Sequence, residues 1–505
     1  MKMQPSKVIQ IDDFDGTTVT NKEMLTYSIS IAKKLKKFGM RQEDLVGVAA
    51  HNTTYLAAVI LGCFFNCTPF HTVHPDFKEV AMAQCFDLTK PKIIFCEGCN
   101  YKTIVKITAD YSPKLYTLSD HLKGVPTIFD LLQPTENDYL YQPETPSLGA
   151  EQTVAILCSS GTTGLPKAVT LSAYRFMLNN PLINGDTVFY CPSTLDWMSG
   201  LMGLYYNCLS SCTRIISRKA FSPDYFVQLT QKYKITYTIM SPINVITLTE
   251  CPQFTCDKMA TLLSLQCIGG PISQHILRNF QKIVSKCIIT RSYGCSETGG
   301  ISINIGLQRE NSAGKLLPNV QLRIVDDKEN NLGPNDIGEI LVHLPYQWGG
   351  YFGNTKETEG LIDALGWCRT GDIGLMDGDC FLYIVDRKKD VLKYLSMHYW
   401  PGEIENTIRE LPQVDDCCVV GIYDEHFGDV AGALVVKQKD SKVPTAEMII
   451  SYVKERLVEP EKQLHNGVYF IEELPRNNNG KVLRPEAKEI FRNLMQTSSI
   501  DYVLL

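Results

Sequence analysis

The first 320 residues alternate between helical and extended patterns, and this alternation constrains the fold more than any other feature. Apolar residues at 25–38 recur at helical spacing, and Gly39 follows as a helix stop. A short apolar run at 44–50, an apolar helical segment at 55–65 and a second short run at 92–96 come next. Parallel strands need a crossover between them, usually a helix, so this order predicts an α/β architecture with parallel sheets.

The last third of the chain has a different pattern. Segments 320–325 and 338–343 are predicted strands of a β-rich subdomain, and the charge run at 386–390 is interpreted as a hinge. A chain of 505 residues exceeds one ordinary domain, so we predict a large α/β domain at 1–386 and a small mobile α+β domain at 387–505. The expected elements of the small domain are a helix at 401–410, strands at 415–422 and 431–437, and a helix at 445–457.

Composition excludes several classes of protein. A net charge of −6 argues against the basic surface that nucleic-acid binding needs, so no nucleic-acid partner is expected. The longest apolar run, at 56–65, is shorter than the roughly 20 residues of a membrane span, so no transmembrane segment is expected. The 18 cysteines are scattered, without paired motifs at zinc spacing, and no secretory signal precedes them. Reduced thiols and a cytoplasmic location are therefore expected.

The strongest local motif follows an apolar strand predicted at 153–158. Its glycines let the backbone approach a phosphate closely, its hydroxyl groups donate hydrogen bonds, and its lysine adds a positive point charge. The spacing differs from that of a Walker loop, and the same composition also suits a polar surface turn. The candidate phosphate-binding residues are Ser159, Ser160, Gly161, Thr162, Thr163, Gly164 and Lys167.

This loop resembles the phosphate loop of the adenylate-forming (ANL) superfamily, which includes acyl-CoA synthetases, peptide-synthetase adenylation domains and beetle luciferases. Further motifs of that superfamily occur in the same order and span residues 20–490 of this chain. The set is similar to that of the acyl-CoA synthetase and beetle-luciferase branch. The resemblance implies ATP and Mg²⁺ as cofactors, a small-molecule carboxylic acid as substrate and CoA as cosubstrate.

Two motifs resemble family segments that bind the nucleotide. Gly269-Gly270-Pro271 resembles the turn that contacts adenine, and Tyr293-Gly294-Cys295-Ser296-Glu297-Thr298 resembles the family's Tyr-Gly-x-Thr-Glu segment. The resemblance implies that the ring of Tyr293 lies against adenine and that the hydroxyl of Ser296 faces the phosphates. It also implies that Glu297 holds Mg²⁺, a hard cation that prefers oxygen ligands.

Later residues resemble the family's ribose-binding and catalytic groups. Asp372 matches the carboxylate that accepts from the ribose hydroxyls, Arg387 matches the arginine that also reaches the ribose, and Lys389 occupies the hinge position. Lys481 matches the catalytic lysine of adenylation, whose charge stabilises attack by a carboxylate on an α-phosphate that is already anionic. Taken alone, the run at 386–390 is more typical of a solvated surface than of a functional segment.

The resemblance implies two half-reactions. A carboxylate and MgATP first give acyl-AMP and pyrophosphate; the small domain then rotates about Lys389, and the thiol of CoA displaces AMP. Lys393 and Ser396 fall in the loop that enters the site for the second half-reaction. Relatives commonly have Gly at the position of Ser396, and Gly suits a backbone with positive φ. Adenylation is therefore better supported than thioester formation.

The acyl pocket is predicted from one position. Trp197 falls where many relatives have an aromatic or histidine side chain at the pocket edge, although it suits core packing equally well. No Asp is evident where an amino-acid ammonium group would bind, so a fatty or aromatic acid is expected, with a medium- or long-chain fatty acid as the leading hypothesis. Some relatives are peroxisomal, but this C-terminus does not match the Ser-Lys-Leu type of signal.

Two alternatives remain open. A luciferase-like monooxygenase would share these motifs and Lys393, but Trp197 replaces the pocket histidine of beetle luciferases. A catalytically impaired nucleotide- or acyl-binding homologue is suggested by Ser396 and by fewer residues before the first helix than the family usually has. The sequence does not determine the oligomeric state.

Overall fold

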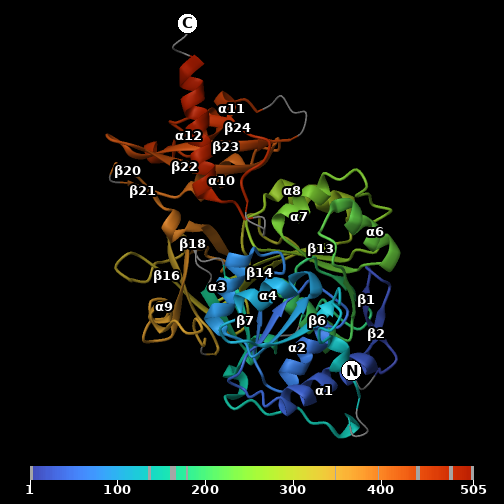
Figure 1. The fold of residues 1–505 in the computed structure, drawn as a ribbon. Coiled ribbons are helices and arrows are strands. Elements are labelled where there is room, and N and C mark those ends of the chain that lie inside the picture. Colours follow the sequence, from blue (N-terminus) through green and yellow to red (C-terminus); the bar gives the residue numbers. More distant parts are fainter. Residues whose placement is uncertain are drawn as a thin grey trace.

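The computed structural model of the 505-residue chain describes residues 4–134, 138–159, 167–177, 180–346, 348–395, 397–438, 444–476 and 481–501. Figure 1 shows a large N-terminal body with a smaller C-terminal body, in orange and red, above it. Over the described residues, the large body contains three sheets and the small body contains one. This arrangement confirms the predicted fold class, α/β subdomains with a β-rich section and a small C-terminal domain.

A six-stranded sheet near the amino terminus presents the predicted phosphate loop. The loop connects β7 (Thr153–Ser159) to β8 (Lys167–Ser172), which form an antiparallel hairpin, whereas the other strands are parallel. Helices α1 (Asn21–Lys37) and α2 (Leu56–Phe65) pack together through the apolar core of this layer. The remaining elements are β3 (Val46–Ala49), β4 (Phe70–Thr72), β5 (Ile93–Glu97), β6 (Lys114–Ser119), α3 (Glu79–Thr89) and α4 (Tyr101–Ile107).

A nine-stranded sheet forms the second layer, and its amino-terminal strands are not evident from the sequence pattern. β1 (Val8–Asp12) pairs in parallel with β10 (Thr213–Ile216), so the start of the chain extends this sheet. β12 (Ser264–Ile268) and β13 (Ile288–Cys295) are parallel neighbours, and β14 (Gly299–Ile305) returns antiparallel. The remaining elements are β2 (Thr18–Thr20), β9 (Val188–Tyr190), β11 (Tyr237–Met240), β15 (Lys315–Leu316), α5 (Met198–Ser210), α6 (Pro223–Tyr233), α7 (Pro242–Thr249) and α8 (Gln274–Ile283).

An antiparallel four-stranded sheet leads to the hinge. Its last strand begins at Leu382, after a turn in which the Asp377 carboxylate accepts two main-chain N–H groups and Cys380 has a φ of 63°. The strand then continues through Arg387, which pairs with Asp372 on the neighbouring strand. The elements are β16 (Gln321–Val325), β17 (Gly338–His343), β18 (Trp367–Met376), β19 (Leu382–Arg387) and the short helix α9 (Thr355–Glu359).

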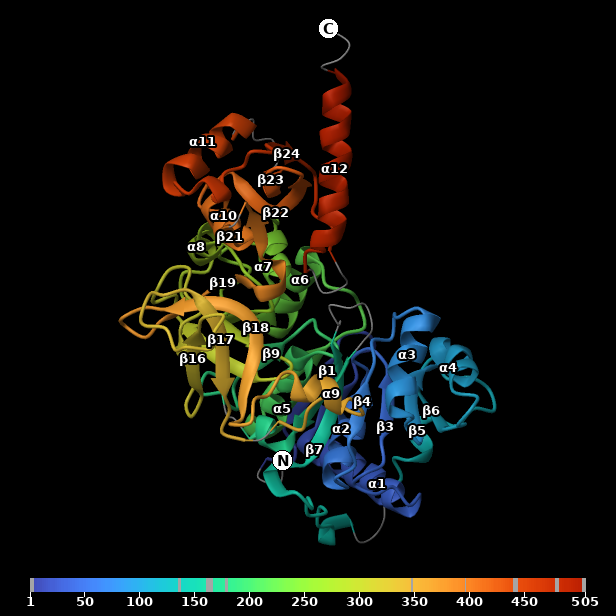
Figure 2. The same cartoon turned by 90° about the vertical axis from the view of Figure 1, so that its left-hand side faces the viewer.

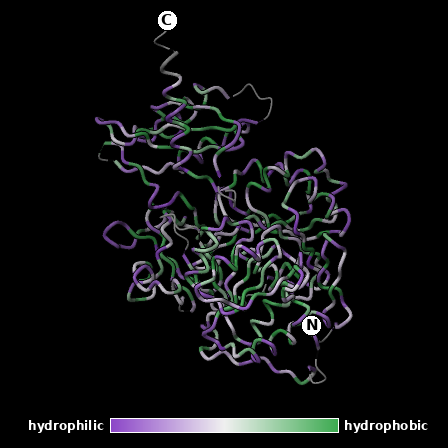
Figure 3. The backbone as a smooth tube through the Cα atoms, viewed as in Figure 1, coloured by the Kyte–Doolittle hydropathy of each residue, from purple (hydrophilic) through white to green (hydrophobic). Residues whose placement is uncertain are grey.

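The small body consists of a five-stranded sheet packed with helices around its own apolar core. Figure 3 shows apolar segments gathered inside both bodies, and Figure 2 shows the last helix, α12 (Arg484–Asp501), extending away from the large body. The four elements expected in this part of the chain are present with slightly different ends. The elements are β20 (Leu392–Tyr394), β21 (Met397–Tyr399), β22 (Val414–Asp424), β23 (Gly428–Lys437), β24 (Val468–Phe470), α10 (Pro401–Ile408) and α11 (Ala446–Arg456).

Candidate active site

Three predicted nucleotide-binding side chains form one hydrogen-bonded cluster. The hydroxyl of Tyr293 on β13 donates to Oδ2 of Asp372 on β18 at 2.6 Å, and Nε of Arg387 on β19 lies 2.9 Å from Oδ1. Asp372 is only 4% exposed, and burial raises the pKa of its carboxyl, whereas Arg387 and Tyr293 act to lower it. Because two partners fix this carboxylate, its remaining lone pairs have a defined direction in which to accept from a ligand hydroxyl.

The predicted adenine turn lies next to this cluster. Gly269 and Gly270 directly follow Ile268 of β12, which pairs with Ser292, the residue before Tyr293. Gly269 has a φ of 102°, in the region that favours glycine, and Pro271 is exposed beside it. The sheet register therefore brings the glycine turn and Tyr293 to neighbouring positions.

The turn between β13 and β14 holds the predicted metal ligand. Oε1 of Glu297 accepts from the hydroxyl of Tyr351 at 2.9 Å, and the Glu297 side chain is half-buried. Gly294 is required beside it, because a Cβ there would collide with the carbonyl oxygen of Gly299 across the hairpin. Over the described residues, no group of three or more His, Cys, Asp or Glu side chains is placed to hold a metal ion. A single carboxylate that shares the ion with nucleotide phosphates fits Mg²⁺, which keeps few protein ligands.

Two further residues hold this turn and were not found from the sequence. Arg175 is buried and donates from Nη1 to the main-chain oxygen of Ser296 and from Nη2 to that of Glu297. The hydroxyl of Tyr346 donates to the oxygen of Thr298 at 3.1 Å. Because the acceptors are all main-chain atoms, no side-chain motif in the sequence marks these contacts.

Lys167, at the end of the predicted phosphate loop, lies close to the residue that hydrogen-bonds Glu297. Its ammonium pairs with Glu357 of α9 and lies 5.1 Å from the ring centroid of Tyr351, the residue that donates to Glu297. Hydrogen bonding to Lys167 lowers the pKa of Glu357. Ser159 ends β7, whereas the predicted residues Ser160, Gly161, Thr162, Thr163 and Gly164 lie outside the described part of the chain.

The small body brings Lys481 to the Asp372 cluster. Loss of solvation lowers the pKa of Lys481, as do the nearby positive charges of Arg387 and Lys389, while Asp390 and Asp372 act to raise it. Lys481 is nevertheless exposed to solvent. The predicted nucleotide-binding cluster and the predicted catalytic lysine, far apart in sequence, therefore lie within electrostatic reach of each other.

The hinge region is tied to the small body through Asp386. Its carboxylate accepts the N–H of Gly402 at 2.6 Å, and burial raises its pKa to about 6. A Cβ at Gly402 would collide with the carbonyl oxygen of Val385. Lys389 lies in the following one-turn helix, 388–390. The division of the chain into two domains between residues 386 and 387 stays a prediction.

The remaining predicted positions are less closely connected to the cluster. Lys393 is exposed on β20, where its main-chain N–H donates to Asp429 at 3.2 Å, and Ser396 lies outside the described residues. Trp197 is half-buried at the start of α5, and its main-chain N–H donates to the main-chain oxygen of Thr194 at 3.2 Å. The acyl-pocket assignment of Trp197 stays a prediction.

A histidine–carboxylate group that acts on Asp196, the residue before Trp197, was also not expected. Nδ1 of His51 lies 2.7 Å from the buried carboxylate of Glu97, and Nε2 lies 3.3 Å from Asp76. Hydrogen bonding to Glu97 raises the pKa of His51. Asp196, directly before Trp197, has a pKa raised by burial and lowered in part by His74 and His51. Charged groups thus lie near the predicted edge of the acyl pocket.

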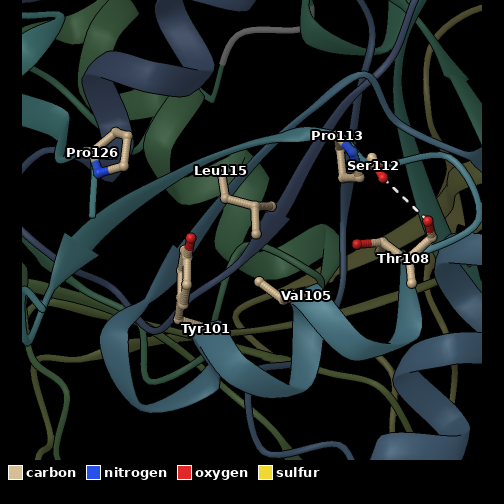
Figure 4. A pocket seen from close by; sticks show the side chains of 8 residues that line it. Tyr101, Val105, Thr108, Ser112, Pro113, Leu115 and Pro126 are labelled. Carbon is tan, nitrogen blue, oxygen red and sulfur yellow. Dashed lines mark hydrogen bonds between the residues drawn. The ribbon is translucent and has the colours of Figure 1, made fainter. Parts of the chain in front are cut away.

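A separate cavity of about 360 Å³ lies between α4 and β6 (Figure 4). Figure 4 shows Tyr101, Val105 and Leu115 around it, with Pro113 and Pro126 farther along its wall. None of the predicted site residues lines this cavity.

The structure thus brings the predicted nucleotide-binding residues Tyr293, Asp372 and Arg387 together with Lys481 nearby, and comparison with known proteins gives the family. The sequence pattern of the AMP-binding enzyme family matches residues 1–352, and that of the AMP-binding enzyme C-terminal domain matches residues 403–481. The chain belongs to the AMP-binding enzyme family of the adenylate-forming superfamily.

Individual relatives align with this chain over most of their length. The chain is 26% identical over 502 residues to 4-coumarate–CoA ligase 3 of Oryza sativa subsp. japonica, covering 95% of this chain and 88% of the relative. It is 25% identical over 506 residues to luciferin 4-monooxygenase of Photinus pyralis, covering 96% and 91%. ATP-bound MatB from Rhodopseudomonas palustris has a TM-score of 0.86 at 22% identity, covering 96% of this chain and 97% of MatB, which shows a shared fold. Within the described residues, every helix is too short or too polar to cross a membrane.

Proposed function

We propose that this protein is an AMP-forming acid–thiol ligase, an acyl-CoA synthetase. In the first step a carboxylate oxygen of the substrate attacks the α-phosphorus of ATP, the bond to the β-phosphate oxygen breaks, and pyrophosphate leaves. In the second step the sulfur of CoA attacks the acyl carbon, loses its proton and displaces AMP. The observation that carries the proposal is the Tyr293–Asp372–Arg387 cluster with Lys481 within reach of its charges.

Each group has a role that its environment suits. The fixed Asp372 carboxylate accepts from the ribose hydroxyls, and Tyr293 presents its ring beside the glycine turn that receives adenine. Glu297 holds Mg²⁺, which neutralises phosphate charge when it is bound. Lys481 adds positive charge where the transition state gains negative charge, and its lowered pKa is consistent with a partly desolvated position.

The second half-reaction is assigned to rotation of the small domain about Lys389, with Lys393 and Ser396 on the entering loop. The substrate is proposed as a medium- or long-chain fatty acid. An aryl acid is the second candidate, because relatives at 26% identity are 4-coumarate–CoA ligases. A luciferase-like monooxygenase is the third candidate function, since luciferin 4-monooxygenases are 25% identical to this chain.

The test is pyrophosphate release from MgATP with a panel of fatty and aryl acids, with and without CoA, and mass spectrometry of the products. Pyrophosphate together with one acyl-CoA supports the ligase and names its acid. Pyrophosphate without acyl-CoA supports adenylation alone and places the defect at the loop with Ser396. Nucleotide binding without pyrophosphate from any acid overturns the proposal in favour of an impaired homologue, and light with luciferin overturns it in favour of a monooxygenase.

A further inference from the structure

Three consecutive main-chain carbonyl groups around the candidate magnesium ligand are held by side chains from elsewhere in the fold. Arg175 donates to the oxygens of Ser296 and Glu297, and Tyr346 donates to the oxygen of Thr298 at 3.1 Å. Arg175 comes from the one-turn helix Ala173–Phe176 after β8, whereas Tyr346 follows β17. Two segments of the large body therefore converge on one turn of the nine-stranded sheet.

The Arg175 side chain has the geometry of a clamp. It is 3% exposed, and a buried cation needs hydrogen-bond acceptors to offset its lost hydration. Its acceptors here are neutral peptide oxygens on adjacent residues, which a planar guanidinium engages from two nitrogens at once. Such a fork fixes the orientation of both peptide planes, whereas an ammonium group, a point charge, does not.

Tyr346 completes the clamp. Its ring centroid lies 5.7 Å from the guanidinium carbon of Arg175, and it also contacts the ring of Tyr174 with centroids 4.8 Å apart. Its hydroxyl holds the third carbonyl, that of Thr298, and Thr298 is itself buried. With three successive carbonyls held, the side chains of Ser296 and Glu297 have little freedom to turn away from the site.

We propose that Arg175 is a positioning residue for adenylation: together with Tyr346 it clamps the main chain at 296–298, so that the Ser296 hydroxyl and the Glu297 carboxylate face the nucleotide phosphates. This inference rests on the proposed function. Among the described residues, the hydrogen bonds that Arg175 donates to the turn reach only its main chain, so we assign its effect to Glu297 rather than to direct contact with the nucleotide. The Tyr351 hydroxyl, 2.9 Å from Oε1 of Glu297, holds the far end of the same side chain.

The test compares Arg175→Lys, which keeps the charge but not the fork, with Arg175→Met, Tyr346→Phe and the matched control Arg214→Lys. Arg214 is also buried, at 4% exposure, but donates to the Asn52 side chain outside the site. Calorimetry measures binding of a non-hydrolysable ATP analogue with and without Mg²⁺, and kinetics measures kcat, KM for MgATP and the Mg²⁺ concentration for half-maximal rate. Thermal unfolding reports whether each variant folds.

For folded Arg175→Lys we expect a fall in kcat and in Mg²⁺-dependent affinity of roughly tenfold to a hundredfold, the loss typical of hydrogen bonds from a charged donor. Both quantities are expected to fall as far in Arg175→Met and to fall less in Tyr346→Phe. The KM for the acid, measured in the same assays, is expected to stay unchanged.

Three outcomes overturn the inference. Full activity in Arg175→Lys but not in Arg175→Met means that charge alone matters, as in direct phosphate binding. A lower unfolding midpoint without a change in Mg²⁺ dependence, as expected for Arg214→Lys, means a structural role only. Equal Mg²⁺-dependent binding in all variants excludes the clamp, and because this readout needs no turnover, it is independent of whether the parent enzyme activates any acid.

Discussion

The two halves of the active site are built in opposite ways. In the large body, Asp372 is 4% exposed and held from two sides by Tyr293 and Arg387, so its orientation is fixed before any ligand arrives. In the small body, Lys481 is exposed and lies near the positive charges of Arg387 and Lys389 as well as the negative charges of Asp390 and Asp372. The proposed binding groups are thus preorganised by the sheets, whereas the position of the proposed catalytic charge depends on where the small domain is placed.

This difference explains why a positive group can occupy a site that already holds an arginine. Repulsion from Arg387 and Lys389 lowers the pKa of Lys481, after the larger effect of lost solvation, while Asp390 and Asp372 act in the opposite direction. A triphosphate would supply the missing negative charge. The comparison predicts that removal of Lys481 affects the chemical step, whereas damage to the Asp372 cluster affects binding.

The largest effect is expected from Lys481→Ala. The rate of adenylation, measured as pyrophosphate release with saturating acid, should fall on the order of a hundredfold or more, as when a key charge-stabilising donor is removed. The KM for ATP should change little, because the ribose and adenine contacts remain. Lys454→Ala, an exposed lysine on α11 of the same small body, is the control. Equal losses in kcat and in ATP affinity would contradict the division of roles.

A smaller, complementary effect is expected from Asp372→Asn. The KM for ATP should rise roughly tenfold to a hundredfold, because hydrogen bonds to a charged group are lost and Arg387 loses its counter-charge. Tyr293→Phe removes only one donor and should have a weaker effect. Isothermal calorimetry with ATP and a kcat measurement separate binding from chemistry. An unchanged ATP affinity in Asp372→Asn would show that this cluster does not contribute to nucleotide binding.

The link between the halves should respond to Gly402→Ala. The new Cβ would collide with the main chain of Val385, so the start of α10 must move away from the end of β19. Overpacking of this kind destabilises by about 1–3 kcal/mol, which chemical denaturation can measure. Gly378→Ala is the control. A Cβ at this exposed position would meet no heavy atom within 4 Å, so the variant should change stability little. Equal stability of both variants would mean that the hinge adapts freely.

Sequence patterns predict much of this architecture because local periodicity and motif chemistry agree. Tyr293, Asp372 and Arg387 lie in motifs with their own side-chain signature, and the structure brings all three together. The antiparallel register of β18 and β19 explains how Asp372 and Arg387 meet. The motif residues at 160–164 and at 396 lie outside the described residues and stay predictions.

Other features depend on tertiary contacts that leave no local signal. β1 pairs with β10, a strand about two hundred residues later in the sequence. Only this pairing identifies β1 as part of the sheet. Arg175 and Tyr346 act on main-chain oxygens, which every residue has, so their partners cannot be identified from residue type. Both features require knowledge of which segments meet in space.

The smallest expected effect concerns a contact between the two bodies that depends on pH. Asp415, at the start of β22, shares a hydrogen bond with Glu250, which follows α7 of the large body, and Asp416 adds further negative charge. Burial, and then Glu250, raise the pKa of Asp415 from 3.8 to about 7. Two carboxyl groups in contact must share a proton, so this contact needs Asp415 protonated.

The sign of the pH dependence follows from that raised pKa. A carboxyl whose pKa is higher in the contact than in its separated state contributes fully below pH 3.8, and the contribution is lost as the pH rises through about 7. The bodies should therefore separate more readily in alkaline solution, by a few-fold in population. Small-angle scattering at about pH 5.5 and about pH 8.5 would measure the change in radius of gyration. Asp415→Asn, neutral throughout, should remove the dependence, whereas Glu455→Gln on α11 should retain it. A pH response of the same size in Asp415→Asn would assign the effect to other groups and leave the position of Lys481 independent of this carboxyl pair.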